Sequence, residues 1–137
     1  MSTENMAWRK EASAETEGIL VGVRSVYVAA RSEPEEGHYF FAYCVIIENR
    51  GSVPVRLLRR RWRILDADSN LETVDGPGVV GETPRIEPGE SFQYTSFCPL
   101  PTPIGTMEGT YDMELDDGAE LEVRVPEFVL AVPTAVQ

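Results

Sequence analysis

Three glycines near the middle of the chain have the spacing of a phosphate-binding loop. Gly76, Gly78 and Gly81 form the pattern G-x-G-x-x-G. In dinucleotide-binding domains this pattern follows a strand and begins a helix, whose N–H groups then face the pyrophosphate. The residues that follow here include Pro84 and Pro88, which exclude a regular helix. The sequence therefore favours glycines that serve the backbone conformation, with a nest of N–H groups that binds a small anion as the alternative.

Arginines are the second feature that could recognise an anion. They are concentrated in one short segment, at Arg56, Arg59, Arg60, Arg61 and Arg63. We expect most of them to form a solvated face that pairs across strands with acidic residues. The acidic candidates are Glu108, Asp112, Glu114, Glu120 and Glu122. A patch that binds an anion or an acidic partner is the alternative interpretation of this face.

Arg60 differs from the other arginines because it shares the strand face of Trp62. A partly buried guanidinium needs a carboxylate or carbonyl partner. We expect Arg60 to form a structural ion pair or to lie at the floor of a site near the glycines. The candidate anion- or nucleotide-binding site therefore comprises Gly76, Gly78, Gly81, Arg60 and Arg85.

One acidic segment resembles the start of a calcium loop. Asp66, Asp68 and Asn70 give the spacing D-x-D-x-N. Leu71 and Pro77 then stand where such a loop requires Gly and Glu. We therefore expect a capped turn with solvated acids at this position.

Residues that could act as nucleophiles, bases or soft metal ligands are few. His38 is the only histidine, and Cys44 and Cys98 are far apart in the sequence. They give neither a zinc or cobalt ligand set nor a nucleophile beside a base. We expect two reduced thiols rather than a disulfide. The sequence predicts no catalytic residue, no metal site and no cofactor, and hence a protein that is not an enzyme.

Length and charge restrict the function classes further. A chain of 137 residues is expected to form one domain. Its formal net charge of −11 disfavours general binding to nucleic acids and to anionic membranes. No apolar run is long enough to span a bilayer, and the first residues lack the basic-then-apolar order of a secretory signal. We expect a cytoplasmic protein that binds no nucleic acid and does not insert into a membrane.

Apolar and polar residues alternate with a period of two along most of the chain, which is typical of strands. We expect strands near residues 19–29, 38–49, 53–66, 92–97, 106–115 and 120–133. Turns rich in Gly and Pro separate them, and no helical period persists over three turns. This pattern predicts an antiparallel sandwich or barrel.

The alternation also predicts which side chains face the core. One strand has a strongly apolar face made of Tyr39, Phe41, Tyr43, Val45 and Ile47. In the next strand, Leu58 shares a face with Trp62 and Ile64 if no bulge intervenes. Residues 1–18 are polar and are expected to be a flexible N-terminal extension, in which Trp8 is the one side chain that could dock.

Several segments together carry a resemblance to a known family. In chain order they are FAYCVIIEN, LLRRRWRILD, VDGPGVVGETPRIEPGESFQYTS, TPIGTMEGTYDM and FVLAVP. They are similar to the motifs of the ApaG family, and the likeness covers residues 19–134. The resemblance implies an all-β fold over these residues, an immunoglobulin- or fibronectin type III-like β-sandwich of two antiparallel sheets.

The resemblance implies less about function. Bacterial ApaG proteins are small stand-alone proteins that are associated, on genetic grounds, with cobalt and magnesium efflux. Related eukaryotic domains, in F-box proteins and in a polymerase delta-interacting protein, resemble protein-binding modules. No enzymatic activity is established for the family, and its G-x-G-x-x-G stretch has been noted as a candidate nucleotide site.

Two function classes follow from the residues and the resemblance. The first, which we favour, is a non-enzymatic module that binds an unidentified protein partner, with a homodimer as one form of this. The second is a binder of pyrophosphate, a nucleotide or a divalent cation at the Gly76–Gly81 loop. A binding module should show an exposed apolar patch or an open sheet edge. A ligand binder should show a pocket in which arginines and the N–H groups of the loop converge.

Overall fold

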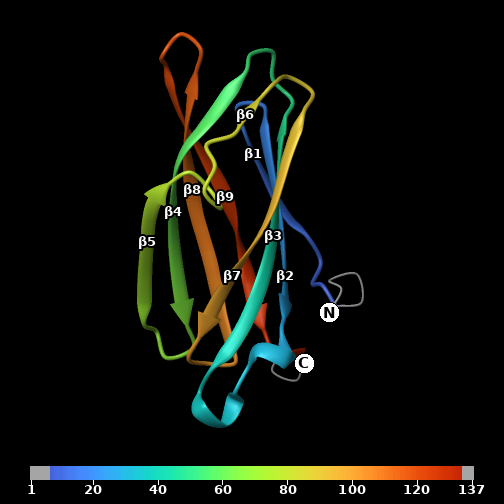
Figure 1. The fold of residues 1–137 in the computed structure, drawn as a ribbon, viewed down its shortest axis with the longest axis vertical. Helices are drawn as coiled ribbons and strands as arrows, with labels where there is room; N and C mark the ends of the chain where they lie inside the picture. The colour runs from blue at the N-terminus through green and yellow to red at the C-terminus, as the bar shows by residue number, and fades with distance from the viewer. Residues whose placement is uncertain (1–6, 134–137) are drawn as a thin grey trace.

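Two antiparallel sheets pack face to face in the computed structural model, which describes residues 7–133 (Figure 1). The first sheet contains, in spatial order, β1 (Ala12–Thr16), β2 (Ile19–Tyr27), β3 (Tyr39–Asn49) and β7 (Ser91–Leu100). The second contains β5 (Leu71–Pro77), β4 (Val55–Asp66), β8 (Ile104–Leu115) and β9 (Glu120–Ala131), with β6 (Arg85–Ile86) paired to the start of β4. The predicted all-β sandwich of two antiparallel sheets is confirmed.

Helical structure in the described residues is limited to short turns. The 3-10 segments η2 (Ala29–Arg31) and η3 (Pro34–Glu36) lie in the connection from β2 to β3. Across residues 7–133, no helix has both the length and the apolar character that crossing a membrane requires.

Both sheets contribute to one apolar core. The inward-facing side chains of β3, among them Phe41, Val45 and Ile47, are fully buried, as the alternation predicted. Trp62 of β4 packs edge-on against Tyr43 of β3, with their ring centroids 5.5 Å apart. Such aromatic pairs add about 1 kcal/mol beyond the area that they bury, so this contact helps to fix the two sheets against each other.

A β-bulge changes the faces of β4. The register between β4 and β8 shifts between Leu57 and Arg59, and Leu57 is fully buried whereas Leu58 is only partly buried. The expectation that Leu58 shares the core face of Trp62 is therefore wrong, because the extra residue of a bulge reverses the alternation. Arg60 lies beyond the bulge, on the same side of the strand as Trp62.

One side of the sandwich is closed by β1. This strand pairs with β2 and also lies against β9, where Thr16 Oγ1 accepts a hydrogen bond from the Arg124 N–H at 3.2 Å. Residues 12–16 fall within the segment expected to be a flexible extension, residues 1–18, so the ordered sheet begins earlier than residue 19. Alanine, serine and glutamate have little strand propensity, and the pairing with β2 determines the conformation instead. Residues 1–6 lie outside the described residues.

Trp8 docks on the outer face of the first sheet. It packs against a small cluster that includes Val26 and Ala42. The guanidinium carbon of Arg24 lies 5.0 Å from the centroid of its ring. The N-terminal segment therefore covers apolar residues that point away from the main core.

The opposite side of the sandwich is open. Within the described chain, β5 and β7 each pair with one neighbouring strand only. Residues 78–84 connect β5 to β6, and both of these strands pair with β4. Between them, this segment runs between the two sheets (Figure 1). Val79 in this segment is fully buried in the core. The glycine pattern thus lies on the segment that partly fills the opening.

Candidate functional site

The glycine pattern forms a tight turn at the open side. Val79 and Glu82 exchange two backbone hydrogen bonds of 2.9 Å, so Val80 and Gly81 occupy the two central positions. Both have positive φ, 43° for Val80 and 80° for Gly81. Gly78 has a φ of 59°, and a Cβ at this position would lie 2.1 Å from the carbonyl oxygen of Glu82. Gly78 and Gly81 therefore have conformational roles in this turn.

The N–H groups of this segment are largely engaged within the protein. The Gly78 N–H donates to the carbonyl oxygen of Leu58 at 2.8 Å. The N–H groups of Val79 and Glu82 donate to each other's carbonyl oxygens. Consecutive N–H groups that converge on one point, as a backbone anion nest requires, are thus not available at residues 78 and 79.

Arg60 reaches this turn from β4. Its Nη1 donates to the carbonyl oxygens of Pro77 and Gly78, both at 3.0 Å. Gly76 is the register partner of Arg60 on β5, and a Cβ on Gly76 would lie 3.0 Å from the same nitrogen. Gly76 therefore leaves the space that the guanidinium occupies. Carbonyl oxygens are one of the two kinds of partner expected for Arg60 from the sequence. The structural ion pair, one of the two roles expected for it, is not found, because none of the ion pairs among residues 7–133 includes Arg60.

A cavity of about 330 Å³ lies beside the Arg60 guanidinium. It is lined by Tyr43, Arg60, Pro77, Val79, Val80, Gly81, Tyr94 and Ser96. The polar groups come from three strands, since Tyr43 belongs to β3, Arg60 to β4, and Tyr94 and Ser96 to β7. The open side of the sandwich therefore brings a cation and hydroxyl groups together at one small hollow.

The tyrosines near this cavity are buried and hydrogen-bonded. The hydroxyls of Tyr94 and Tyr111 share a hydrogen bond. Burial raises the pKa of Tyr43, Tyr94 and Tyr111 above the usual 10.0, and the nearby charge of Arg60 opposes this rise without cancelling it. A side-chain hydrogen bond from Ser96 also opposes the rise at Tyr43. All three phenols are therefore protonated at neutral pH and able to donate hydrogen bonds.

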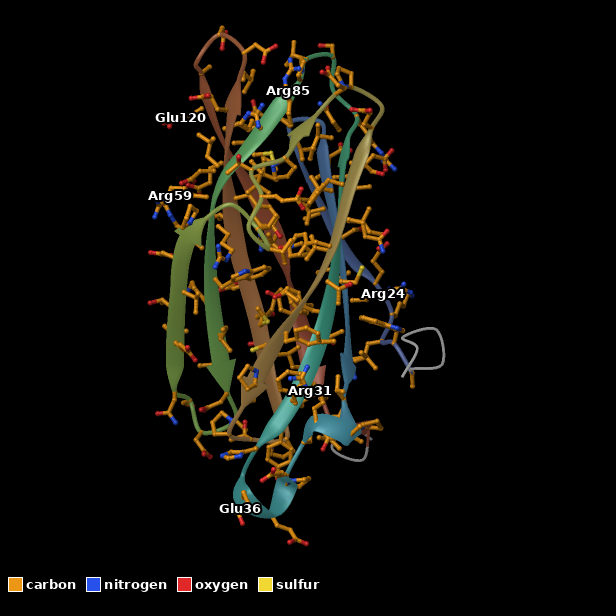
Figure 2. All side chains as sticks on the ribbon, in the orientation of Figure 1. Arg24, Arg31, Glu36, Arg59, Arg85 and Glu120 are labelled. Atoms are coloured by element: carbon orange, nitrogen blue, oxygen red, sulfur yellow. The ribbon has the colours of Figure 1, made fainter. Side chains whose placement is uncertain are left out.

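Arg85 does not belong to this cavity. It lies on β6, and its guanidinium forms ion pairs with Glu87 and Asp116, both at 2.6 Å. In Figure 2 it lies near the upper end of the molecule, in the view where the longest axis is vertical. The structure brings Arg60 together with Gly76, Gly78 and Gly81, but it does not bring Arg85 to them, because β6 returns the chain to the far end of β4.

The remaining arginines of β4 lie mostly on the outer face of the second sheet. Arg61 pairs with Asp112 at 2.9 Å, and Arg63 pairs with Glu108 at 3.8 Å. Arg59 projects away from the molecule (Figure 2). The expected pairing across strands is thus present for Arg61 and Arg63.

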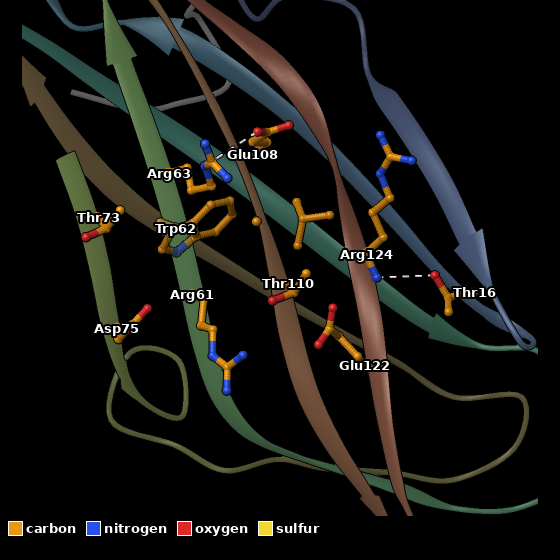
Figure 3. A pocket seen from close by; sticks show the side chains of 12 residues that line it. Thr16, Arg61, Trp62, Arg63, Thr73, Asp75, Glu108, Thr110, Glu122 and Arg124 are labelled. Atoms are coloured by element: carbon orange, nitrogen blue, oxygen red, sulfur yellow. Dashed lines mark hydrogen bonds and ion pairs between the residues drawn. The ribbon is translucent and has the colours of Figure 1, made fainter. Parts of the chain in front are cut away.

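A groove of about 580 Å³ crosses this outer face (Figure 3). Its walls carry charges of both signs and three threonines, from Thr16, Arg61, Arg63, Thr73, Asp75, Glu108, Thr110, Glu122 and Arg124. Because opposite charges alternate here and several are already paired, the groove has no single electrostatic preference that would select one class of ligand.

The acidic turn and the thiols have structural roles. Asp66 Oδ1 accepts hydrogen bonds from the N–H groups of Asp68 and Asn70, at 2.8 and 3.0 Å, as a capped turn requires. Cys44 and Cys98 are free and buried, and burial raises the pKa of Cys98 to about 12. In the described part of the chain, no group of three His, Cys, Asp or Glu side chains is placed to hold a metal ion.

Sequence reasoning missed the hydroxyl groups of the cavity. Tyr43 was expected in the core, and Tyr94 and Ser96 were given no role. Their inward direction follows from the alternation along β7. One signal was present in the sequence, since a buried tyrosine, unlike phenylalanine, requires a hydrogen-bonding partner.

Comparisons with known proteins agree closely with each other. The family model of the ApaG domain matches residues 29–115. Protein ApaG of Methylobacterium sp. (strain 4-46) is 54% identical over 120 residues, which cover 88% of this chain and 92% of the relative. Protein ApaG of Anaeromyxobacter dehalogenans is 53% identical over 121 residues, covering 88% and 95%. A crystal structure assigned as an ApaA protein of Bordetella pertussis has a TM-score of 0.82 and 48% identity, covering 84% of this chain and 94% of that chain.

Proposed function

Since this chain belongs to the ApaG domain family, we propose that it is a non-enzymatic cytoplasmic module which binds a partner chain along the free edge of β7. The observation that carries this proposal is the composition of that edge. An exposed sheet edge presents unpaired N–H and C=O groups. Monomeric proteins protect such edges from pairing with another chain, for example with charged side chains. β7 reads SFQYTSFCPL and contains no charged residue, in a chain of which 26% is charged.

The other open edge is different. β5 reads LETVDGP and carries Glu72 and Asp75, both exposed. Like charges of this kind oppose the addition of a further strand. The contrast supports β7 rather than β5 as the edge at which an extended segment adds by β-strand pairing.

Side chains beside β7 offer a contact for such a segment. Phe97 is 51% exposed and stacks on Phe40, with ring centroids 5.4 Å apart. The guanidinium carbon of Arg31 lies 4.4 Å from the Phe40 ring and 5.5 Å from the Phe97 ring. Exposed aromatic side chains next to an arginine are typical of residues that dominate binding energy at interfaces.

A lysine placed on this edge tests the proposal. Thr95 is exposed in the middle of β7 and Thr73 is exposed on β5, so Thr95→Lys and Thr73→Lys form a matched pair. Oligomeric state by light scattering and proteins retained by the immobilised full chain are compared for both variants. We expect self-association or partner retention to be lost in Thr95→Lys and kept in Thr73→Lys. Equal retention by wild type and Thr95→Lys would place the interface elsewhere.

The link to cobalt and magnesium that the resemblance implies is also a proposal. We propose that it acts through the bound partner, because no metal-ligating cluster occurs between residues 7 and 133. In a bacterium that lacks its own ApaG protein, wild type should restore tolerance to added Co²⁺ and Thr95→Lys should not. Full restoration by Thr95→Lys would separate metal tolerance from the β7 edge.

A second candidate function is the binding of a small ligand at the open side. One observation favours it, the position of Arg60 beside a cavity of about 330 Å³ without a carboxylate partner among the described residues. The ligands expected from the sequence are pyrophosphate, a nucleotide or a divalent cation at the Gly76–Gly81 loop. A thermal-shift series with Mg²⁺, Co²⁺, pyrophosphate and ATP tests each, since a ligand at a hundred times its Kd adds about 2.7 kcal/mol of stability.

A further inference from the structure

We infer that the cavity at the open side binds a small organic carboxylate, held by the Arg60 guanidinium and by the hydroxyl of Tyr43, to which Ser96 donates a hydrogen bond. The inference rests on the second candidate function and names its ligand class. It assigns recognition to side chains of three strands, whereas the glycine pattern had suggested recognition by backbone N–H groups.

The first argument is the incomplete pairing of Arg60. A guanidinium carries five N–H donors. The two on Nη1 face the carbonyl oxygens of Pro77 and Gly78, and no hydrogen bond within residues 7–133 uses the donors on Nη2 and Nε. Neutral carbonyl oxygens do not neutralise the charge, and a partly buried cation without a counter-charge is unfavourable. An anion in the cavity would supply both the charge and the missing acceptors.

The second argument is the lining of the cavity. Its volume of about 330 Å³ lies at the small end of ligand-binding pockets, which span about 300–1,000 Å³. Pro77, Val79 and Val80 supply apolar lining, and Tyr43 and Ser96 supply hydroxyl groups. A ligand with one anionic group and a short apolar body matches both kinds of lining.

The third argument concerns the charge of the ligand. The planar carboxylate accepts two parallel N–H bonds from one guanidinium. A polyphosphate carries several charges, and one arginine cannot neutralise them in a chain with a net charge of −11. The Gly78 and Val79 N–H groups, which would have to assist, are bonded to carbonyl oxygens of the protein. A single carboxylate is therefore favoured over pyrophosphate or a nucleotide.

Nuclear magnetic resonance of the ¹⁵N-labelled full chain tests the inference with sodium benzoate as the probe and benzamide as its neutral match. We expect saturable shifts at the Arg60 Nε–H and at the backbone amides of Gly81 and Ser96 with benzoate. Benzamide should cause none. Absence of saturation with benzoate would overturn the inference.

Two variants and one control test which side chains bind the benzoate. Arg60→Lys keeps the charge but loses the planar fork, and it should weaken benzoate binding by about tenfold or more. Arg59→Lys, an exposed neighbour on the same strand, should leave the affinity unchanged. Tyr43→Phe removes only a hydroxyl and should weaken benzoate binding several-fold. This variant therefore tests the site even if Arg60→Lys disturbs the fold. Unchanged affinity in Arg60→Lys or in Tyr43→Phe would contradict the assignment.

Pyrophosphate and ATP, added in parallel, separate this inference from the function on which it rests. If either saturates the same amides while benzoate does not, the ligand class is wrong but the ligand-binding function stands. If pyrophosphate, ATP and benzoate all fail to cause saturable shifts, then both the carboxylate inference and the proposed ligand-binding function are wrong.

Discussion

Arg60 and Gly76 are register partners on β4 and β5, and the Arg60 guanidinium occupies the space that a side chain at residue 76 would need. A Cβ there would lie 3.0 Å from Nη1 of Arg60. The glycine and the arginine are thus a matched pair, in which the missing side chain of one allows the other to reach the carbonyl oxygens of the turn.

This pairing predicts the effect of a side chain at residue 76. Gly76→Val should displace the guanidinium from Pro77 and Gly78 and lower the free energy of unfolding by about 1–2 kcal/mol. In the Arg60→Ala background the same change should cost less, because no guanidinium remains to be displaced. Urea unfolding of the two single variants and the double variant measures the coupling. Strict additivity would contradict the steric relationship.

Gly78 and Gly81 should differ in their tolerance of a Cβ. Gly78→Ala combines a φ of 59° with a contact of 2.1 Å to the Glu82 carbonyl oxygen, and it should destabilise the protein by more than about 2 kcal/mol. Gly81→Ala has a φ of 80° but no atom within 4 Å of the new Cβ, so the loss should be limited to the conformational cost of about 1–2 kcal/mol. Thermal unfolding of both variants checks the order, and a larger loss at Gly81 would contradict it.

Val80 is expected to be strained. It is a β-branched residue with a φ of 43°, and it is 51% exposed at the tip of the turn. Asparagine tolerates this conformation better, so Val80→Asn should raise the free energy of unfolding by about 0.5–1 kcal/mol. Val53→Asn is the control, since Val53 is 47% exposed and has no positive φ. An equal effect of the two substitutions would exclude strain as the cause.

The buried phenols predict a loss of stability in alkaline solution. Burial raises the folded-state pKa of Tyr94 and Tyr111 above 10.0, so the unfolded chain releases their protons first as the pH rises. Their contribution is complete below the unfolded pKa and is lost as the pH rises towards the folded pKa. We expect a decrease of about 0.8 kcal/mol per tyrosine between pH 8 and pH 10.5.

Urea unfolding at the two pH values measures this decrease. Replacement of both residues, Tyr94→Phe with Tyr111→Phe, should make it smaller, because the substituted chain has two fewer protons to release on unfolding. A decrease of the same size in the double variant would show that other groups cause the alkaline loss.

Much of the fold could be predicted from the sequence because strand alternation is a local signal. The core face of β3, from Tyr39 to Ile47, follows from residue type alone. The face of Leu57 could not be predicted, because the bulge that reverses it depends on pairing with β8. β1 was missed for the same reason, since its conformation depends on β2 and β9 rather than on its own composition.

The candidate site was only partly predictable. The glycine pattern and the face of Trp62 suggested that Arg60 lies near the turn, and it does. Arg85 was also expected at this site, but it lies on β6, where its guanidinium pairs with Glu87 and Asp116. Tyr94 and Ser96 lie at the same cavity as Arg60 because β7 and β4 face each other across the sandwich. No local sequence pattern encodes which strands of the two sheets face each other.

The unequal edges of the two sheets have a consequence for assembly. β1 is held against β9, β5 is short and acidic, and β7 is the one long, uncharged edge strand among residues 7–133. A second copy that pairs β7 with β7 would use the same edge on both chains and leave no similar edge free. Assembly through β7 would therefore stop at a dimer. An uncharged edge strand of this kind would then not lead to fibres.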